Sequence, residues 1–312
     1  MRYTDFAMME ILDPGFLTTV QDLGRTGWAR YGVPPSGPLD EAAFRAANLL
    51  VGNEPNAAGL EITLVGPTLR LWRPALVAVC GADFDLWIGR LKVPTWHALF
   101  VRAGKVLRFG QRRSGARTYL AIDGGLDLPF YLDSRATYLP GGFGGLEGRP
   151  LRRGDRLPLG LPRQNPAGRA GRAWSSDRRL PYAVHPTLRV VMGPQDEHFT
   201  NGAIETFLTA DYELLPESNR MGARLRGPEI AHRGEGNIVS DGVVTGSVQV
   251  PANGQPIVML ADHQTTGGYP KIATVVRADL PLLAQCLPGD RVRFRAVTLE
   301  EARATALDPK DS

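Results

Sequence analysis

Short apolar runs separated by turns dominate the first half of the chain. Glycine or proline interrupts these runs repeatedly between residues 59 and 159, and β-branched residues dominate the extended segment at residues 8–22, which is typical of strands. Helical patterns do not alternate with the strands, so a parallel α/β sheet is disfavoured and a barrel or a pair of packed sheets is expected. The strands expected here cover residues 69–72, 75–80, 84–88, 98–101, 106–109 and 118–122.

Apolar residues recur at helical spacing in only a few places. The clearest lies between Asp40, which stands where an N-cap is expected, and Gly52, which stands where a helix commonly ends. Shorter helices are expected at residues 196–208, 279–285 and 300–306. The sequence therefore predicts a mainly β protein with a few short helices.

One pattern of a turn followed by a strand occurs three times, at residues 103–109, 153–159 and 288–294. Each copy places a glycine and a polar residue before an alternating apolar run. Glycine can take the positive φ of a tight turn, and the alternation turns one face of the strand inward. Because the third copy lies in the second half of the chain, two β domains of similar construction are expected in tandem.

Length and charge add a domain boundary to this picture. A chain of 312 residues favours two domains, and its 36 glycines and 25 prolines fit short elements joined by tight turns. The formal net charge is +4, but residues 149–180 alone hold nine arginines against two aspartates. We expect a domain at residues 1–160, a basic Pro/Gly/Arg linker at 161–184 and a second domain at 185–312.

Several classes of protein are disfavoured by what the sequence lacks. The basic stretch has only one aromatic residue, Trp174, and no reading helix, so nucleic-acid binding is not expected. The two cysteines, Cys80 and Cys286, have no metal-site or disulfide spacing, and no metal site is expected. No apolar run is long enough to cross a membrane and no secretory leader is evident, so a cytoplasmic protein is expected.

No self-sufficient catalytic sequence signature is present either. The chain contains no phosphate-binding G-x-x-x-x-G-K-[ST] loop, no G-x-S-x-G elbow and no H-E-x-x-H helix. The glycine-rich residues 141–148 have backbone N–H groups that an anion can use, but no strand-to-helix context follows them. A hairpin loop is the favoured interpretation of that segment.

The densest polar segment follows an apolar run at residues 257–260. It contains Asp262, His263, Gln264, Thr265, Thr266, Tyr269 and Lys271, with Gln249 on an earlier segment. Polar groups that converge at a strand end on a rigid β scaffold are typical of small-molecule sites. The alternative is an elaborate turn in which these side chains satisfy backbone groups, and residue chemistry leaves both interpretations open.

Two cations add to this candidate site. Lys271 is one of only four lysines against 32 arginines, which suggests a need for a compact point charge. Arg220, in the polar segment 218–222, has a guanidinium group suited to bidentate binding of a carboxylate. Two constrained turns near the N-terminus, at residues 18–25 and 32–40, either line a site or shape a barrel entrance.

These separate segments occur in a characteristic order along nearly the whole chain. They are residues 18–25, 32–40, 119–125, 141–151 with Gly154 and Asp155, 218–222 with Arg224, Leu225, Gly227 and Pro228, 246–251, and 262–272 with 288–290. Together they resemble the family of the 5-oxoprolinase C-subunit, KipA and allophanate hydrolase subunit 2, also called biotin-dependent carboxyltransferase-like proteins. The resemblance implies two tandem cyclophilin-like β-barrel domains.

The resemblance also implies an activity and partners. It implies one component of an ATP-dependent 5-oxoprolinase that opens 5-oxo-L-proline to L-glutamate, a component that is inactive alone. The implied partners are a KipI or allophanate hydrolase subunit 1 type protein (the B-subunit) and a LamB/YcsF-type A-subunit, with ATP shared with or supplied by the partner. The chain has no Met-Lys-Met biotin-attachment sequence, so biotin enters only in the carboxyltransferase alternative.

The matching positions give the candidate site residues. The expected catalytic residues are Asp262, Lys271 and Arg220, and the expected substrate-binding residues are Gln249, Gln264, Thr265, Thr266, Tyr269, Ser36 and Asp40. The cations would hold a carboxylate or a developing oxyanion, Asp262 would orient a group or accept a proton, and the two glutamines would bind the amide. Two alternatives stay open, namely a carboxyltransferase acting on urea or a similar amide, and a non-enzymatic KipA-like antagonist of a kinase inhibitor.

Overall fold

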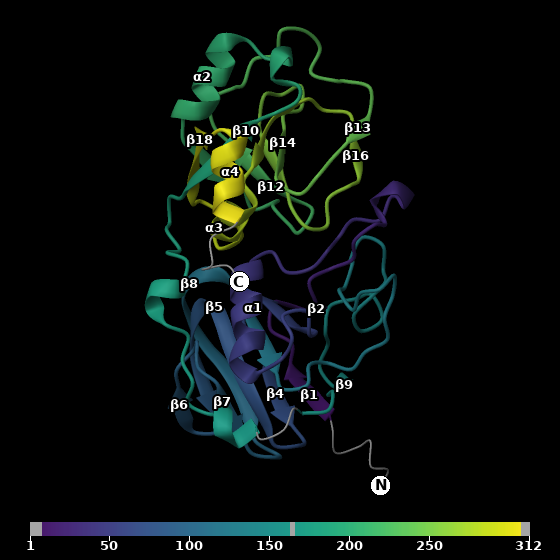
Figure 1. Ribbon diagram of the computed structural model, residues 1–312, viewed down its shortest axis with the longest axis vertical. Coiled ribbons are helices and arrows are strands. Elements are labelled where there is room, and N and C mark those ends of the chain that lie inside the picture. The colour runs from purple at the N-terminus through teal and green to yellow at the C-terminus, as the bar shows by residue number, and fades with distance from the viewer. Residues whose placement is uncertain (1–7, 163–165, 307–312) are drawn as a thin grey trace. The chain divides into compact units, whose positions relative to one another are not determined.

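The computed structural model describes residues 8–162 and 166–306 (Figure 1). Contacts between Cα atoms divide the chain into two compact units. Unit 1 consists of Met1–Arg25 and Ser36–Arg179, and unit 2 consists of Thr26–Pro35 and Leu180–Ser312. A short loop from the N-terminal part thus belongs to the second unit, a feature that the sequence pattern does not reveal. The predicted folding-domain boundaries at residues 160 and 184 stay a prediction.

Unit 1 is built on one nine-stranded antiparallel sheet. Six strands follow the order β2-β3-β8-β4-β1-β9, and β5 pairs with β8, β6 and β7. The strands are β1 (Met8–Asp13), β2 (Leu17–Gln21), β3 (Gly59–Thr63), β4 (Thr68–Leu71), β5 (Ala75–Ile88), β6 (Leu91–Val93), β7 (Leu99–Val101), β8 (Val106–Ile122) and β9 (Arg156–Pro158).

Two of these strands are longer than the sequence pattern predicts. Residues 75–80 and 84–88 form one strand, β5, and residues 106–109 and 118–122 belong to one strand, β8. The polar residues between the runs do not end the strands, because register shifts between Gly81 and Leu86 let the pairing of β5 with β8 continue. Gly81 has a φ of +110°, which a residue with a side chain rarely adopts.

Helix α1 (Glu41–Val51) packs against β5 and β8 of this sheet (Figure 1). It begins at the predicted cap, where the Asp40 side chain accepts a hydrogen bond from the backbone N–H of Ala43 at 3.0 Å. It ends at Gly52, whose φ is +81°. The buried face includes Phe44, whose ring lies edge-on to Tyr119 of β8.

Residues 166–179 of the basic segment predicted as a linker belong to unit 1 and pack on it, whereas residues 180–184 belong to unit 2. Its residues include the short 3-10 helices η3 (Pro166–Arg169) and η4 (Ser176–Arg178). The backbone N–H of Ala98 donates to the carbonyl of Arg172 at 2.8 Å, and the Arg179 guanidinium lies 5.1 Å from the ring centroid of Trp96. Arg163 lies outside the described residues.

Unit 2 is a closed barrel with the strand order β10-β17-β14-β15-β12-β11-β18. The parallel contact between β10 and β18 joins strands from the two ends of the unit, and the other pairs are antiparallel. The strands are β10 (Thr187–Met192), β11 (Tyr212–Leu214), β12 (Gly222–Arg226), β14 (Ser247–Gln249), β15 (Ile257–Met259), β17 (Lys271–Val275) and β18 (Arg291–Ala296). The mainly β prediction is confirmed.

Short helices accompany the barrel at the predicted places. They are η5 (Asp196–His198), α2 (Asn201–Thr209), η6 (Arg277–Asp279), α3 (Leu280–Ala284) and α4 (Leu299–Ala306), and the loop Thr26–Pro35 adds η2 (Ala29–Tyr31). Helix α2 contacts β18, where the rings of Phe207 and Phe294 stack at a centroid distance of 4.4 Å. These contacts help to fill the apolar core of unit 2.

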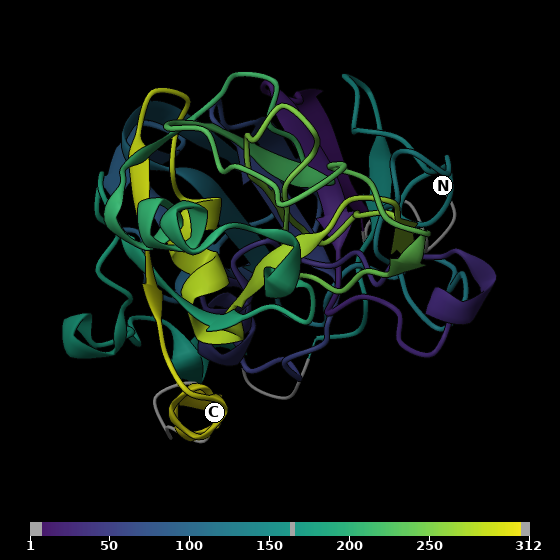
Figure 2. The same cartoon turned by 90° about the horizontal axis from the view of Figure 1, so that it is seen from above.

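A two-stranded ribbon of β13 (Asp241–Gly242) and β16 (Thr266–Gly267) stands to one side of the barrel (Figures 1 and 2). Strand β16 follows directly after the polar segment that begins at Asp262. The ribbon thus holds the predicted site residues in a loop that the barrel strands β15 and β17 anchor at both ends.

Candidate functional site

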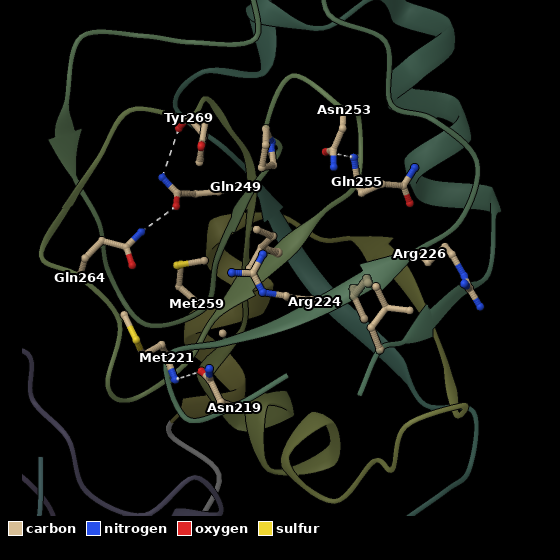
Figure 3. Close-up of a pocket in the computed structure, with 15 residues that line it drawn as sticks. Asn219, Met221, Arg224, Arg226, Gln249, Asn253, Gln255, Met259, Gln264 and Tyr269 are labelled. Carbon is tan, nitrogen blue, oxygen red and sulfur yellow. Dashed lines mark hydrogen bonds between the residues drawn. The ribbon is translucent and has the colours of Figure 1, made fainter. Parts of the chain in front are cut away.

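A cavity of about 490 Å³ lies in unit 2, against strands β12, β14 and β15 (Figure 3). On β12, the exposed Arg224 and Arg226 line the cavity together with the buried Gly222 and Leu225. Alternate residues of a strand point to opposite faces. The side chains of Arg224 and Arg226 therefore lie on the same outward face of β12.

The cavity is lined by both polar and apolar side chains. Its lining includes the carboxamides of Asn219, Gln249, Asn253, Gln255 and Gln264, the guanidinium groups of Arg224 and Arg226, and the less polar side chains of Leu215, Met221, Ile257, Met259 and Tyr269. Three of the predicted substrate-binding residues, Gln249, Gln264 and Tyr269, are thus brought together in one cavity.

These three residues form a short chain of hydrogen bonds (Figure 3). Gln264 Nε2 donates to Gln249 Oε1 at 3.1 Å, and Gln249 Nε2 donates to the backbone carbonyl of Tyr269 at 3.3 Å. Within residues 8–162 and 166–306, the Oε1 atom of Gln264 has no hydrogen-bond partner, and only one of its two N–H donors is used. A carboxamide with a free carbonyl and a free N–H can pair with both polar atoms of an amide ligand.

Because Gly267 has no side chain, the carboxamide of Gln249 can lie next to it. A Cβ atom at position 267 would lie 2.4 Å from Gln249 Nε2 and 3.3 Å from its Cδ. Gln249 itself is 1% exposed and sits beside a register shift in the pairing of β14 with β17. The glycine and the bulge together fix where the carboxamide lies.

The two arginines of the cavity have different surroundings. Arg226 Nη2 is 3.1 Å from one carboxylate oxygen of Glu213 and 3.2 Å from the other. In the described part of the chain, the guanidinium group of Arg224 has no such partner. Figure 3 shows that guanidinium group among the lining side chains, where it can meet an anionic ligand.

Asp262 and Arg220 form a buried ion pair with each other. Arg220 Nε donates to Asp262 Oδ2 at 2.8 Å, and Arg220 Nη2 donates to Asp262 Oδ1 at 3.2 Å. The side chain of Asp262 is 1% exposed and that of Arg220 is 6% exposed. The Asp262 N–H also donates to the Arg220 carbonyl at 2.9 Å. This pair ties the polar segment to the loop before β12 and is absent from the cavity lining.

Lys271 is also paired, through a cluster that closes the ribbon onto the barrel. Its Nζ atom lies 2.7 Å from Asp241 Oδ2, and that hydrogen bond lowers the pKa of the Asp241 carboxyl. Gln195 connects the two residues, since its Nε2 donates to Asp241 Oδ2 at 3.0 Å and its Oε1 accepts from the Lys271 N–H at 3.0 Å. The Lys271 side chain is buried at 5% exposure.

The remaining residues of the polar segment shape its backbone. The Thr265 carbonyl accepts a hydrogen bond from the Val243 N–H at 3.0 Å, and Thr266 pairs with Gly242 in the ribbon. His263 is buried, with its Nδ1 atom 2.6 Å from the Gln264 carbonyl oxygen, and burial lowers its pKa below the ordinary value. A buried histidine that is bound to the backbone fits a structural role.

Ser36 and Asp40, also predicted to bind substrate, belong to unit 1 and are engaged there. Arg25 Nη1 donates to Ser36 Oγ at 3.0 Å. The fully buried Asp40 caps α1, and its N–H donates to the Tyr119 hydroxyl at 2.8 Å. The hydroxyl in turn donates to Glu61 Oε2 at 2.8 Å. The two N-terminal turns are held by these buried networks.

Sequence reasoning did not select Arg224, Met221 and Met259 as site residues. The alternation of Gly222, Arg224 and Arg226 with two apolar residues was a usable signal, because it places both arginines on one outward face of a strand. What the sequence could not supply was the identity of the neighbouring strand that completes the cavity.

Two findings bear on cofactors and membranes. In residues 8–162 and 166–306, no group of three or more His, Cys, Asp or Glu side chains is arranged to hold a metal ion. None of the helices found there has the length and apolar character needed to span a membrane.

Comparison with known proteins identifies relatives along almost the entire chain. Residues 31–296 match the family described as carboxyltransferase domain, subdomain A and B. The chain is 40% identical to the 5-oxoprolinase C-subunit of Escherichia coli over 295 residues, which are 95% of this chain and 93% of that protein.

Urea-processing proteins are similar as well. The chain is 33% identical to the urea amidolyase of Lachancea kluyveri, over 94% of this chain but only 17% of that protein. The crystal structure of the K. lactis urea amidolyase superposes with a TM-score of 0.90 at 31% identity, covering 99% of this chain and 20% of that one. The chain therefore belongs to the carboxyltransferase domain family, together with proteins named as the C-subunit of 5-oxoprolinase.

Proposed function

We propose that this chain is a subunit of an ATP-dependent 5-oxoprolinase, which converts 5-oxo-L-proline, ATP and water to L-glutamate, ADP and phosphate. The observation that carries the proposal is the 40% identity to a 5-oxoprolinase C-subunit over 93% of the length of that protein. It acts with a KipI-type B-subunit and a LamB/YcsF-type A-subunit, and it is inactive alone. ATP is shared with or supplied by the partner, since the chain has no phosphate-binding loop sequence.

The chemistry requires activation of an unreactive amide. A lactam carbonyl is a poor electrophile, and transfer of a phosphoryl group from ATP to its oxygen turns that oxygen into a good leaving group. Water then adds to the carbon and the ring nitrogen takes a proton and departs, which opens the ring and leaves an acyl phosphate. A second water hydrolyses this acyl phosphate, and the C–O bond to the phosphate breaks to release L-glutamate and phosphate. Positioning of the lactam and stabilisation of charge on its oxygen are therefore the tasks of the protein that binds it.

The carboxamides of Gln249 and Gln264 are the proposed amide-binding groups. A lactam presents its N–H and its carbonyl oxygen side by side, and a carboxamide does the same. Gln264 can therefore accept a hydrogen bond from the lactam N–H and donate one to the lactam carbonyl oxygen. Gln249 holds Gln264 in place through their 3.1 Å hydrogen bond, and Tyr269 completes the chain.

Asp262, Arg220 and Lys271 stay the proposed charged groups of the reaction. Each of these charges is held in an ion pair, Asp262 with Arg220 and Lys271 with Asp241. Thr265 and Thr266 at the ribbon, together with Ser36 and Asp40, stay proposed substrate-binding residues.

A carboxyltransferase acting on urea is the second candidate. It is favoured by the 33% identity to a urea amidolyase over 94% of this chain. The carboxamide edge of Gln264 fits urea as well as a lactam, since both present N–H and C=O groups side by side. In this alternative, carboxybiotin is the cofactor and arrives on another protein.

Co-expression with the products of its neighbouring genes separates the two candidates. The purified complex is assayed for ATP-dependent release of glutamate from 5-oxo-L-proline and, in parallel, for carboxylation of urea when supplied with a biotin carboxylase and a biotin carrier. Glutamate release supports the first candidate, and urea carboxylation without glutamate release supports the second. A complex that lacks this chain is the control.

A further inference from the structure

Arg224 is placed to decide which ligands the cavity accepts. It lies on the same outward face of β12 as Arg226, and both line the cavity. Arg226 is neutralised by Glu213 at 3.1 Å. In the part of the chain that the structure describes, no acidic side chain or other acceptor pairs with the guanidinium group of Arg224. A guanidinium group without a protein partner is a ready bidentate donor for a carboxylate.

The other lining residues define what accompanies that carboxylate. Met221, Ile257 and Met259 provide apolar surface for a small ring. Gly222 keeps this surface open, because a Cβ atom there would lie 3.0 Å from Ile257 Cγ2 and 3.4 Å from Met259 Cε. The free edge of the Gln264 carboxamide provides the donor and acceptor for an amide. The cavity thus offers three complementary groups, one each for a ring, an amide edge and an anion.

The carboxylate is the feature that separates 5-oxoproline from a neutral amide. Urea and a simple lactam satisfy the carboxamide edge equally well, but neither has a group for Arg224. We propose that Arg224 binds the carboxylate of the lactam substrate and makes the cavity select a carboxylate-bearing lactam over neutral amides. This inference rests on the proposed 5-oxoprolinase function and names the residue that sets its substrate class.

Ligand-observed NMR titrations of the purified full chain test this selection directly, with 5-oxo-L-proline, 2-pyrrolidinone and urea as probes. Wild type should bind 5-oxo-L-proline about tenfold or more tightly than 2-pyrrolidinone, because a hydrogen-bonded charge pair commonly has that effect. Arg224→Met should remove this preference and leave 2-pyrrolidinone binding unchanged, and Arg224→Lys should keep part of it. Arg226→Met, on the same face but paired with Glu213, is the matched control and should retain the preference.

The titration has outcomes that overturn the inference. They are a wild type that binds neither lactam or binds both alike, an Arg224→Met variant that keeps the preference, and an Arg226→Met variant that loses it equally. Thermal unfolding of each variant verifies the fold. Turnover by the reconstituted complex is a separate readout: if the carboxylate preference depends on Arg224 but no glutamate is released, the proposed function fails while the binding role of Arg224 stands.

Discussion

At the scale of single residues, the position of one carboxamide depends on a glycine. Gly267→Ala would place a methyl group 2.4 Å from Gln249 Nε2, so the side chain of Gln249 must shift, which disturbs its hydrogen bond to Gln264. We predict that this substitution weakens lactam binding about tenfold, as expected for a lost hydrogen bond, while the thermal stability changes little. Binding and unfolding are measured on the same samples.

The facing strand of the ribbon supplies the control for this substitution. A Cβ atom at Gly242 would have no atom within 4 Å, so Gly242→Ala should bind like wild type. If Gly267→Ala binds the lactam as tightly as Gly242→Ala does, the placement of Gln249 does not matter for binding.

Asp262 illustrates how pairing changes the meaning of a charged residue. Its carboxylate is bound to Arg220 by two hydrogen bonds and is 1% exposed, so Asp262→Asn leaves a buried guanidinium group without its counter-ion. Breaking one side of a buried pair costs about 3 kcal/mol of unfolding free energy. We predict a clear drop in melting temperature for this variant, measured by calorimetry.

The double variant Arg220→Met/Asp262→Asn is the informative control. It removes both charges, and it should therefore be more stable than Asp262→Asn alone. An Asp262→Asn variant with the wild-type melting temperature would contradict the structural role of the pair.

At the scale of elements, the N-cap of α1 tests whether Asp40 has a structural or a ligand-binding role. Asp40→Ala removes the acceptor for the Ala43 N–H and should lower the free energy of unfolding by about 1–2 kcal/mol. Asp40→Asn keeps a capping oxygen and should lower it less. Denaturant unfolding measures both.

The activity of the reconstituted complex distinguishes the roles of Asp40. A structural cap predicts that Asp40→Asn retains turnover per folded molecule. If Asp40→Asn instead unfolds like wild type but has lost turnover, Asp40 acts on the ligand, as the sequence analysis expected.

Local patterns predicted the elements that local chemistry determines. The cap at Asp40, the end of α1 at Gly52 and the three glycine turns all appear, with φ values of +74°, +89° and +93° at Gly104, Gly154 and Gly289. The full lengths of β5 and β8 were missed, because bulges let two apolar runs join across polar residues. Bulges depend on the partner strand, which a single sequence does not reveal.

In the candidate site too, local sequence predicted some features, whereas others depend on distant segments. Gln249, Gln264 and Tyr269 were predicted and do share a cavity. The partners of the charged residues were not predicted, because they come from distant segments: Arg220 lies 42 positions before Asp262, and Asp241 lies 30 positions before Lys271. Which cation is paired and which is free is a property of the barrel, and it decided the role that we assign to Arg224.

At the scale of the whole molecule, we propose that this chain binds the lactam and that its partners carry out the rest of the reaction. The chain covers 93% of a protein that is named as one subunit of 5-oxoprolinase. Its sequence holds none of the phosphate-binding signatures that ATP chemistry commonly uses. Two consequences follow from this division of tasks. The isolated chain should bind the lactam, and only the complex should turn it over.

The most direct test is an ATP-dependent assay of glutamate release from 5-oxo-L-proline. It compares the purified chain alone, the co-expressed complex, and the same complex without this chain. The account predicts that only the co-expressed complex releases glutamate, with ADP and phosphate formed in equal amounts. Robust release by the contaminant-free chain alone, or by the complex that lacks it, would contradict the central claim that this chain is a necessary and dependent subunit of a 5-oxoprolinase.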